Sequence, residues 1–288
     1  MKHKIAVMLI MIMTVTMIFS SFAYADDNSV GIKVEFDKTA YVKGETATAT
    51  LTLTGLSGAK QEGLKIGAFE THLKFDTNKL TYNTSVFDEN IFKGTDSGKL
   101  TKEFQPTKDY ANVILVAFAY ESGISLDGVD TNGNLKIGTI TFTINDNVSD
   151  KIEIGFQESA DTYVTELVQP KLSSKFDIVV PQEDSTADIK NVITENASAK
   201  FETNKVTASI DIRLSNGQST ILIAQLFDKA TGLTKGTVVK PNLTASANIN
   251  DITFNNISDK TNLTVKYYLW ESFANMKALT TIQPTEVQ

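Results

Sequence analysis

The sequence predicts an all-β protein built from two β-sandwich modules. Short runs of alternating or β-branched residues, separated by turn residues, cover 30–180 and again 206–270, which is typical of sandwiches and barrels. Apolar residues at helical spacing persist for three turns nowhere in the sequence. The chain has 288 residues, 41% of them hydrophobic, which is enough for two ordinary domain cores.

In the first module, strands are predicted in chain order from the apolar pattern. Ile32, Val34 and Phe36 alternate with polar residues, and the Thr-rich run 46–54 carries its apolar residues on one face. The continuously apolar run 113–120 predicts a strand covered on both faces. The expected strands are 30–36, 46–54, 69–75, 113–120, 135–144, 152–156 and 175–180.

A polar, acidic segment headed by Pro181 separates the two patterns, and we expect residues 182–199 to be an inter-domain linker that lets the modules move semi-independently. The second module, residues 200–288, is expected to be a smaller immunoglobulin-like sandwich. Its predicted strands are 206–214, 220–227, 249–254 and 263–270.

The N-terminus predicts a secretory signal peptide. Lys2 and Lys4 precede an apolar stretch from Ile5 to Phe19, and Ala23-Tyr24-Ala25 forms a small-x-small cleavage site. A membrane anchor is the alternative, but this stretch is shorter than the roughly 20 residues of a spanning helix. We therefore expect residues 1–25 to be removed and the protein to be secreted, either free or associated with the cell surface.

Composition excludes several classes of function. The formal net charge is −7 at pH 7. Loss of the signal peptide removes Lys2 and Lys4 and makes the charge more negative. Such a chain repels phosphate backbones and anionic lipid, so neither nucleic-acid binding nor a membrane-surface role is expected. No stretch after the signal peptide approaches the roughly 20 apolar residues of a spanning helix, so membrane insertion is not expected either. The sequence has no Cys, which excludes disulfides and cysteine-based zinc sites.

Several motifs of the first module, taken in order, resemble the cohesin family. They are the turn 41–46 (YVKGET), the run 66–76 (IGAFETHLKFD) with Leu80, the segment 117–119 (AFA) with the loop 122–128, and the strand 138–144 (GTITFTI). The resemblance implies a nine-stranded jelly-roll or immunoglobulin-like sandwich over residues 26–181, without catalytic activity. Thr77 replaces the family's usual Pro, and residues 57–64 form an insertion.

Cohesins bind the dockerin modules of other secreted proteins, often polysaccharide-degrading enzymes. The resemblance implies that the partner-binding face includes Ala68, Glu70, His72, Tyr110, Ala117 and Tyr120. Glu70 would accept hydrogen bonds, and the two tyrosines would supply buried area with a polar tip. From the strand pattern itself, His72 should point outward, opposite Thr71 and Leu73. A plain surface role for His72 is the alternative.

The second module resembles an uncharacterised immunoglobulin-like domain found at the ends of secreted Firmicutes proteins. The matching stretches are 208–210, 223–228, 268–272 and 276–279. The resemblance implies no activity for this module. Tyr268 and Trp270 share one face of its last strong strand; they could form a sugar platform, but core packing is the favoured interpretation.

No catalytic, metal or cofactor site is expected. His72 is the only His beyond the signal peptide, and the Asp and Glu residues are scattered over turns and outward strand positions rather than buried. The segment 127–134 begins like a calcium loop, but Leu135 and Thr141 occupy the places of the required Gly and Glu. An Asn-Gly hairpin explains that segment better.

Three functions remain as hypotheses. The first is a secreted protein-binding module for a dockerin-bearing or other secreted protein, linked to extracellular polysaccharide degradation or cell-surface assembly. The second is a carbohydrate-binding module, and the third is a structural surface protein without a specific ligand. A flat face of Glu, Thr and small residues would favour the first, whereas a cleft with stacked aromatic residues would favour the second.

Overall fold

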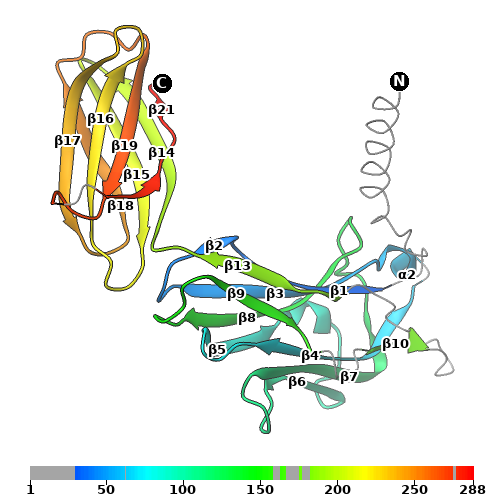
Figure 1. Cartoon of the computed structure of the whole chain (residues 1–288). Helices are drawn as coiled ribbons and strands as arrows, with labels where there is room; N and C mark the ends of the chain where they lie inside the picture. The colour runs from blue at the N-terminus through cyan, green and yellow to red at the C-terminus, as the bar shows by residue number, and fades with distance from the viewer. Residues whose placement is uncertain (1–29, 62, 158–162, 167–174, 177–181, 275–276) are drawn as a thin grey trace, which may run out of the picture.

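The computed structural model describes residues 30–61, 63–157, 163–166, 175–176, 182–274 and 277–288 (Figure 1). Almost all of them lie in strands or turns, and the strands form two sandwiches with separate hydrophobic cores. The all-β prediction is therefore confirmed. None of the helices in these ranges is long and apolar enough to cross a membrane. The predicted signal peptide lies outside the described residues.

The first sandwich pairs a five-stranded sheet with an eight-stranded sheet. The smaller sheet has the order β12 (Gln182–Glu183), β1 (Gly31–Phe36), β3 (Thr46–Thr54), β8 (Leu135–Ile144) and β5 (Leu80–Phe87). The larger sheet contains β6 (Leu100–Pro106), β7 (Val113–Ser125), β4 (Lys65–Phe75), β9 (Lys151–Phe156), β10 (Tyr163–Glu166), β11 (Lys175–Phe176), β13 (Ser185–Ile189) and β2 (Ala40–Tyr41). Nine of these strands have five or more residues, and one of the nine, β13, lies beyond residue 181, the expected end of the module.

Strand β4 is the centre of the larger sheet. Strand β7 pairs along one edge of β4, and β6 pairs with the far edge of β7. The other edge of β4 is shared: β10 pairs with residues 66–70, and β9 pairs with residues 73–75. The helical elements are short, namely α2 (Ser57–Gln61), inside the predicted insertion, and η1 (Glu89–Phe92).

Alternation along the strands fills the core of the first sandwich. In β3, Ala47, Ala49, Leu51 and Leu53 are fully buried, because residues two apart on a strand share a face. Each fully buried Leu contributes about 1.5–3 kcal/mol to the free energy of unfolding. The buried faces of both sheets meet in one continuous cluster that runs from Val30 to Ile189 in sequence.

The segment expected to be a linker is largely strand. Strand β12 pairs with β1, and β13 pairs with β9 and β2. Ala187 and Ile189 of β13 are buried in the first core, with 3% and 8% of their surface exposed. Strand β14 (Val192–Glu202) already belongs to the second sandwich. Only residues 190 and 191 connect β13 and β14.

The second sandwich packs a three-stranded sheet against a five-stranded sheet. The smaller sheet contains β14, β15 (Lys205–Leu214) and β18 (Ala247–Asn255); the larger contains β17 (Leu233–Leu243), β16 (Thr220–Asp228), β19 (Leu263–Trp270), β20 (Ala278–Thr281) and β21 (Thr285–Glu286). Its core includes Ile210 and Ile252 from one sheet and Leu222 and Leu226 from the other, all fully buried.

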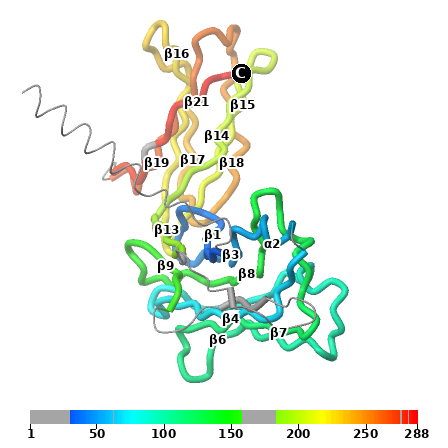
Figure 2. The backbone as a smooth tube through the Cα atoms, turned by 90° about the vertical axis from the view of Figure 1, so that its right-hand side faces the viewer, coloured from blue at the N-terminus to red at the C-terminus, as the bar shows by residue number. Residues whose placement is uncertain are grey.

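The two sandwiches meet beside the point where β13 continues into β14 (Figure 2). The turns after β2 and β8 contact the turn that follows β15. Ser215 Oγ accepts a hydrogen bond from the backbone N of Lys43, after β2, at 3.1 Å, and the Asn216 side chain donates to Asp146, after β8, at 3.0 Å. Arg213 forms an ion pair with Glu45 at 2.8 Å. The modules are therefore joined by specific contacts in addition to the chain itself.

Candidate functional site

The side of β6, β7 and β4 that points away from the core is a candidate binding surface. Residues that pair across these strands carry their side chains on the same side, which gives three rows. The rows are Ala68–Ala119–Thr101, Glu70–Ala117–Glu103 and His72–Leu115–Gln105. We call these nine residues the outer face; none of them is buried.

The central strand of the outer face is apolar on both sides. Ile114, Val116 and Phe118 of β7 point into the core and are at most 3% exposed. Leu115 and Ala117 point the other way and are half-buried. The prediction that 113–120 is covered on both faces is therefore wrong: one apolar side of this strand faces outward.

Glu70 and His72 lie side by side on the outer face. Their side chains are 32% and 22% exposed, and Glu70 Oε1 lies 4.0 Å from His72 Nε2. Thr71 and Leu73 between and beyond them are fully buried, so the predicted orientation of His72 is confirmed. The Nδ1 atom of His72 is buried and has no hydrogen-bond partner among the described residues.

Tyr120 does not belong to this surface. It lies three positions beyond Ala117, and side chains an odd number of positions apart on a strand point to opposite faces. Its side chain is 9% exposed and belongs to the first core, where its hydroxyl oxygen accepts a hydrogen bond from the backbone N of Asp96 at 3.0 Å. The expectation that Tyr120 contacts a partner is corrected on this ground.

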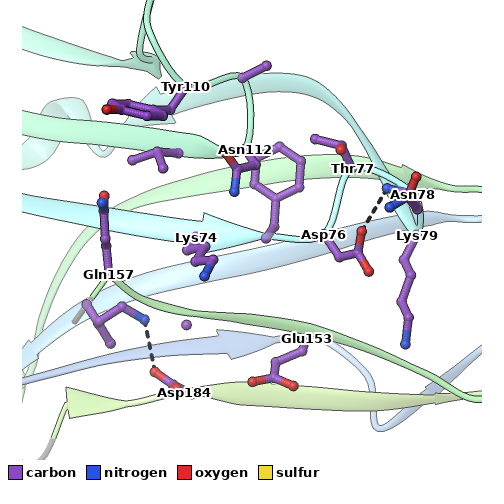
Figure 3. A pocket seen from close by; sticks show the side chains of 15 residues that line it. Lys74, Asp76, Thr77, Asn78, Lys79, Tyr110, Asn112, Glu153, Gln157 and Asp184 are labelled. Carbon is purple, nitrogen blue, oxygen red and sulfur yellow. Dashed lines mark hydrogen bonds between the residues drawn. The ribbon is translucent and has the colours of Figure 1, made fainter. Parts of the chain in front are cut away.

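Tyr110 is exposed, but it lies beyond the end of the outer face, in the turn between β6 and β7. Its side chain is 63% exposed. It lines an open hollow of about 970 Å³ between the end of β4, this turn and strand β9 (Figure 3). The hollow begins at Lys74, the next outward residue of β4 after His72.

The hollow is lined mainly by polar side chains. Its labelled residues in Figure 3 are Lys74, Asp76, Thr77, Asn78, Lys79, Tyr110, Asn112, Glu153, Gln157 and Asp184. Asp76 and Asp184 each accept a backbone N–H, from Asn78 at 2.9 Å and from Phe156 at 3.0 Å. Asp184 lies directly over Gly155, where a Cβ atom would be 2.6 Å from the carboxylate. A glycine at 155 therefore makes room for this acid.

Sequence reasoning missed the β6 side of the outer face. The outward residues of this strand, Thr101, Glu103 and Gln105, are exposed. Phe104, between two of them, points inward, and only 9% of its surface is exposed. The alternation is visible in the sequence only through Leu100 and Phe104, because Lys102 occupies the inward position between them. Lys102 stays at the edge, where its ammonium group lies 4.7 Å from the centre of the Phe92 ring.

The loop expected to form a hairpin rather than a calcium site is held together by its own groups. Asp130 Oδ1 accepts hydrogen bonds from the backbone N of Asn132 and of Asn134, at 2.8 and 2.9 Å. These bonds hold the pKa of Asp130 below its ordinary value. Lys60 from α2 donates to the carbonyl of Val129 at 2.6 Å. Within the described residues, no three His, Cys, Asp or Glu side chains cluster as metal ligands do.

The buried polar side chains of the described residues are Thr52, Thr71, Ser215, Thr220 and Thr264. No Asp or Glu is among them.

Tyr268 and Trp270 lie outside the second core, so the core-packing interpretation of this pair is wrong. The residues of β19 that enter the core are Val265, Tyr267 and Leu269. Tyr268 is 36% exposed, and Trp270 meets Phe273 edge to face with ring centres 6.4 Å apart. The rings of Trp270 and Phe273 are nearly perpendicular, at 89°, so this pair does not form a coplanar platform.

No family model and no curated protein match the chain. Among solved structures, it is similar to a Clostridium thermocellum cohesin, OlpC, in complex with a dockerin: 15% identity, 58% of this chain and 97% of that one, TM-score 0.40. It is also similar to the seventh ScaB type I cohesin of Pseudobacteroides cellulosolvens, with 13% identity over 55% of this chain and 92% of that one and a TM-score of 0.40. A third similar structure is the cohesin module of a Clostridium perfringens family 33 glycoside hydrolase, with 14% identity over 56% of this chain and 94% of that one and a TM-score of 0.36.

Proposed function

We propose that the first sandwich is a non-catalytic protein-binding module that takes a dockerin-type partner on the outer face. The observation that carries this proposal is the composition of that face. Small or apolar residues, Leu115, Ala117 and Ala119, run along its middle on β7. The flanking residues on β6 are polar, and so are those on β4 except Ala68. An apolar centre inside a polar rim is the usual arrangement of a protein interface.

The geometry of the central row fits a partner rich in hydrogen-bond donors. Glu70 and Glu103 both pair with Ala117, one from each side. Because neighbouring strands lie about 4.8 Å apart, the two acidic residues stand about 10 Å apart with only a methyl group between them. A helix could approach the sheet closely at Ala117 and donate hydroxyl, amide or ammonium groups to the two carboxylates.

The dockerin class comes from the sequence resemblance. Two of its motifs, 66–76 and 117–119, lie on β4 and β7, the two strands that supply six of the nine outer-face residues. We extend the proposal to a secreted protein that takes part in extracellular polysaccharide degradation or cell-surface assembly through such a partner. The alternative of a structural surface protein has no specific observation in its favour.

The test is binding of the chain from residue 26 to a panel of purified dockerin modules, measured by calorimetry. At least one should bind, and Ala117→Arg should abolish the binding, because an arginine in the central row prevents close approach. Thr141→Arg is the matched control, because Thr141 points outward from β8 on the opposite sheet. Binding of no dockerin, or equal binding by Ala117→Arg, would contradict the proposal.

A further inference from the structure

We infer that the hollow beside the outer face is a second binding site, for a neutral sugar chain. The proposal stands on the lining of the hollow and does not depend on the partner of the outer face. Figure 3 shows Tyr110 and Asn112 on one side of the hollow, Glu153 and Asp184 on the other, and Lys74 between them.

The aromatic part of the site is Tyr110. Its ring is 63% exposed, so a ligand can cover it and remove apolar area from water. The backbone around it is held by the turn: Tyr110 O accepts a hydrogen bond from Thr107 Oγ1 and from the N of Val113, both at 3.0 Å. The turn therefore fixes the backbone of Tyr110, and replacement of the side chain leaves these bonds in place.

The polar part of the site has unused hydrogen-bonding capacity. Among the described residues, the side chains of Lys74, Tyr110, Asn112 and Glu153 have no hydrogen-bond partner. Asp76 and Asp184 use one oxygen each for a backbone N–H, and their remaining lone pairs can accept further bonds. Donors and acceptors thus converge on the hollow from opposite sides.

The chemistry of the lining selects the ligand class. Three carboxylates, those of Asp76, Glu153 and Asp184, outnumber the one free ammonium group among the described residues of the lining, that of Lys74, and so disfavour an anion. The other lysine of the lining, Lys79, is paired with Asp150 at 3.0 Å. The acids do not cluster as cation ligands within the described residues. A wholly apolar ligand would strip water from these groups without replacing their bonds. A pyranose ring satisfies the site, because it presents C–H groups to an aromatic ring and hydroxyl groups around its edge.

The experiment is titration of the chain from residue 26 with cellohexaose, xylohexaose, mannohexaose and chitohexaose, followed by calorimetry and by tyrosine fluorescence. At least one should bind. Tyr110→Ala should weaken that binding about threefold to tenfold, the range expected for loss of one aromatic contact. Tyr110→Phe keeps the ring and should stay within about threefold of the parent. Thr141→Ala, on the opposite sheet, should bind like the parent.

Two results would overturn the inference: none of the four hexasaccharides binds, or one binds with equal affinity to the parent and to Tyr110→Ala. Circular dichroism of each variant checks that it is folded. The substitutions differ from those that test the outer face, so loss of one activity can be separated from loss of the other.

Discussion

Arg213 of the second sandwich binds Glu45 of the first through one guanidinium nitrogen, Nη1, which lies 2.8 Å from each carboxylate oxygen. The other terminal nitrogen lies 2.6 Å from Oε1 of Glu195. Both Arg213 and Glu45 have side chains that are 17% exposed, so salt screens this pair less than a surface pair. Glu45 also forms an ion pair with Lys38. The only arginine of the chain thus lies at the junction of the two modules.

The turn of residues 41–46, one of the motifs that resemble cohesins, forms part of the junction between the two sandwiches. Gly44 in that turn has φ +79°, and a Cβ atom there would collide with the side-chain amide of Asn216. The backbone N of Asn216 donates to the carbonyl of Lys43 at 3.3 Å. Close approach at Gly44 and charge pairing at Glu45 together favour one fixed arrangement of the modules over semi-independent motion.

The first prediction concerns this arrangement. Because the chain has no Cys, Thr81→Cys and Thr234→Cys can carry a dye pair, one in each sandwich. The parent should give a single narrow distance distribution by single-molecule fluorescence transfer. Glu45→Gln should broaden it, because loss of a charge-assisted hydrogen bond costs about 1.5–3 kcal/mol. Glu35→Gln, which breaks only an exposed pair with Lys33, is the control. A broad distribution in the parent would refute a fixed junction.

The second prediction concerns pH. Burial opposes ionisation of Glu45, but hydrogen bonds from Lys38, the backbone N of Val42 and Arg213 outweigh it and lower the pKa of this carboxyl. The junction therefore gains stability from ionised Glu45 above the ordinary glutamate pKa of about 4.3 and loses it as pH falls through the lowered value. The same distance distribution should stay narrow from about pH 5 to 8 and broaden below about pH 4. Broadening near neutral pH would assign the effect to another group.

The third prediction concerns the boundary of the first module. A fragment of residues 26–181 lacks β12 and β13, whereas a fragment of residues 26–190 keeps them. The shorter fragment exposes the pocket of Ile189 and the edges of β1 and β9. Its free energy of unfolding in urea should be lower by about 2 kcal/mol or more, the value of one buried Ile side chain. Equal stability of the two fragments would restore residues 182–189 as a linker.

The linker error shows where sequence reasoning stops. Strands with apolar residues at every second position, such as 46–54 and 206–214, were predictable because burial of one face demands that pattern. Strand β13 has only Ala187 and Ile189 facing inward, among acidic and hydroxyl residues typical of linkers. Its strand character comes from β9 and β2, which supply the hydrogen bonds. Pairing with strands that are distant in sequence cannot be predicted from the residues of β13 alone.

The candidate binding residues likewise include some that strand alternation predicts and others that only the fold brings together. The outward direction of Glu70 and His72 follows from period-two alternation on β4 alone. Tyr120 was misplaced because its assignment to the surface ignored the alternation that places Ala117 there. Tyr110 could not be assigned to the hollow, because that site combines a turn, the end of β4 and strand β9, which only the fold brings together.

The last prediction separates binding from folding on β4. Leu73 is fully buried in the first core, so Leu73→Ala should lower the free energy of unfolding by about 2–5 kcal/mol through the cavity it leaves. The double variant Glu70→Ala/His72→Ala removes two side chains from the outer face. The Glu70 side chain is 32% exposed and the His72 side chain is 22% exposed. The double variant should stay folded, because the backbone bonds of β4 to β7 remain.

The double variant should nevertheless weaken capture of the dockerin partner by about 1–4 kcal/mol, the usual range for central interface residues. Urea unfolding followed by circular dichroism gives the first quantity, and calorimetric titration of the same samples gives the second. Thr141→Ala is the control for both. If the double variant unfolds, Glu70 and His72 serve the fold and not the surface. If it folds and binds with the parent's affinity, the partner contacts a different part of the first sandwich.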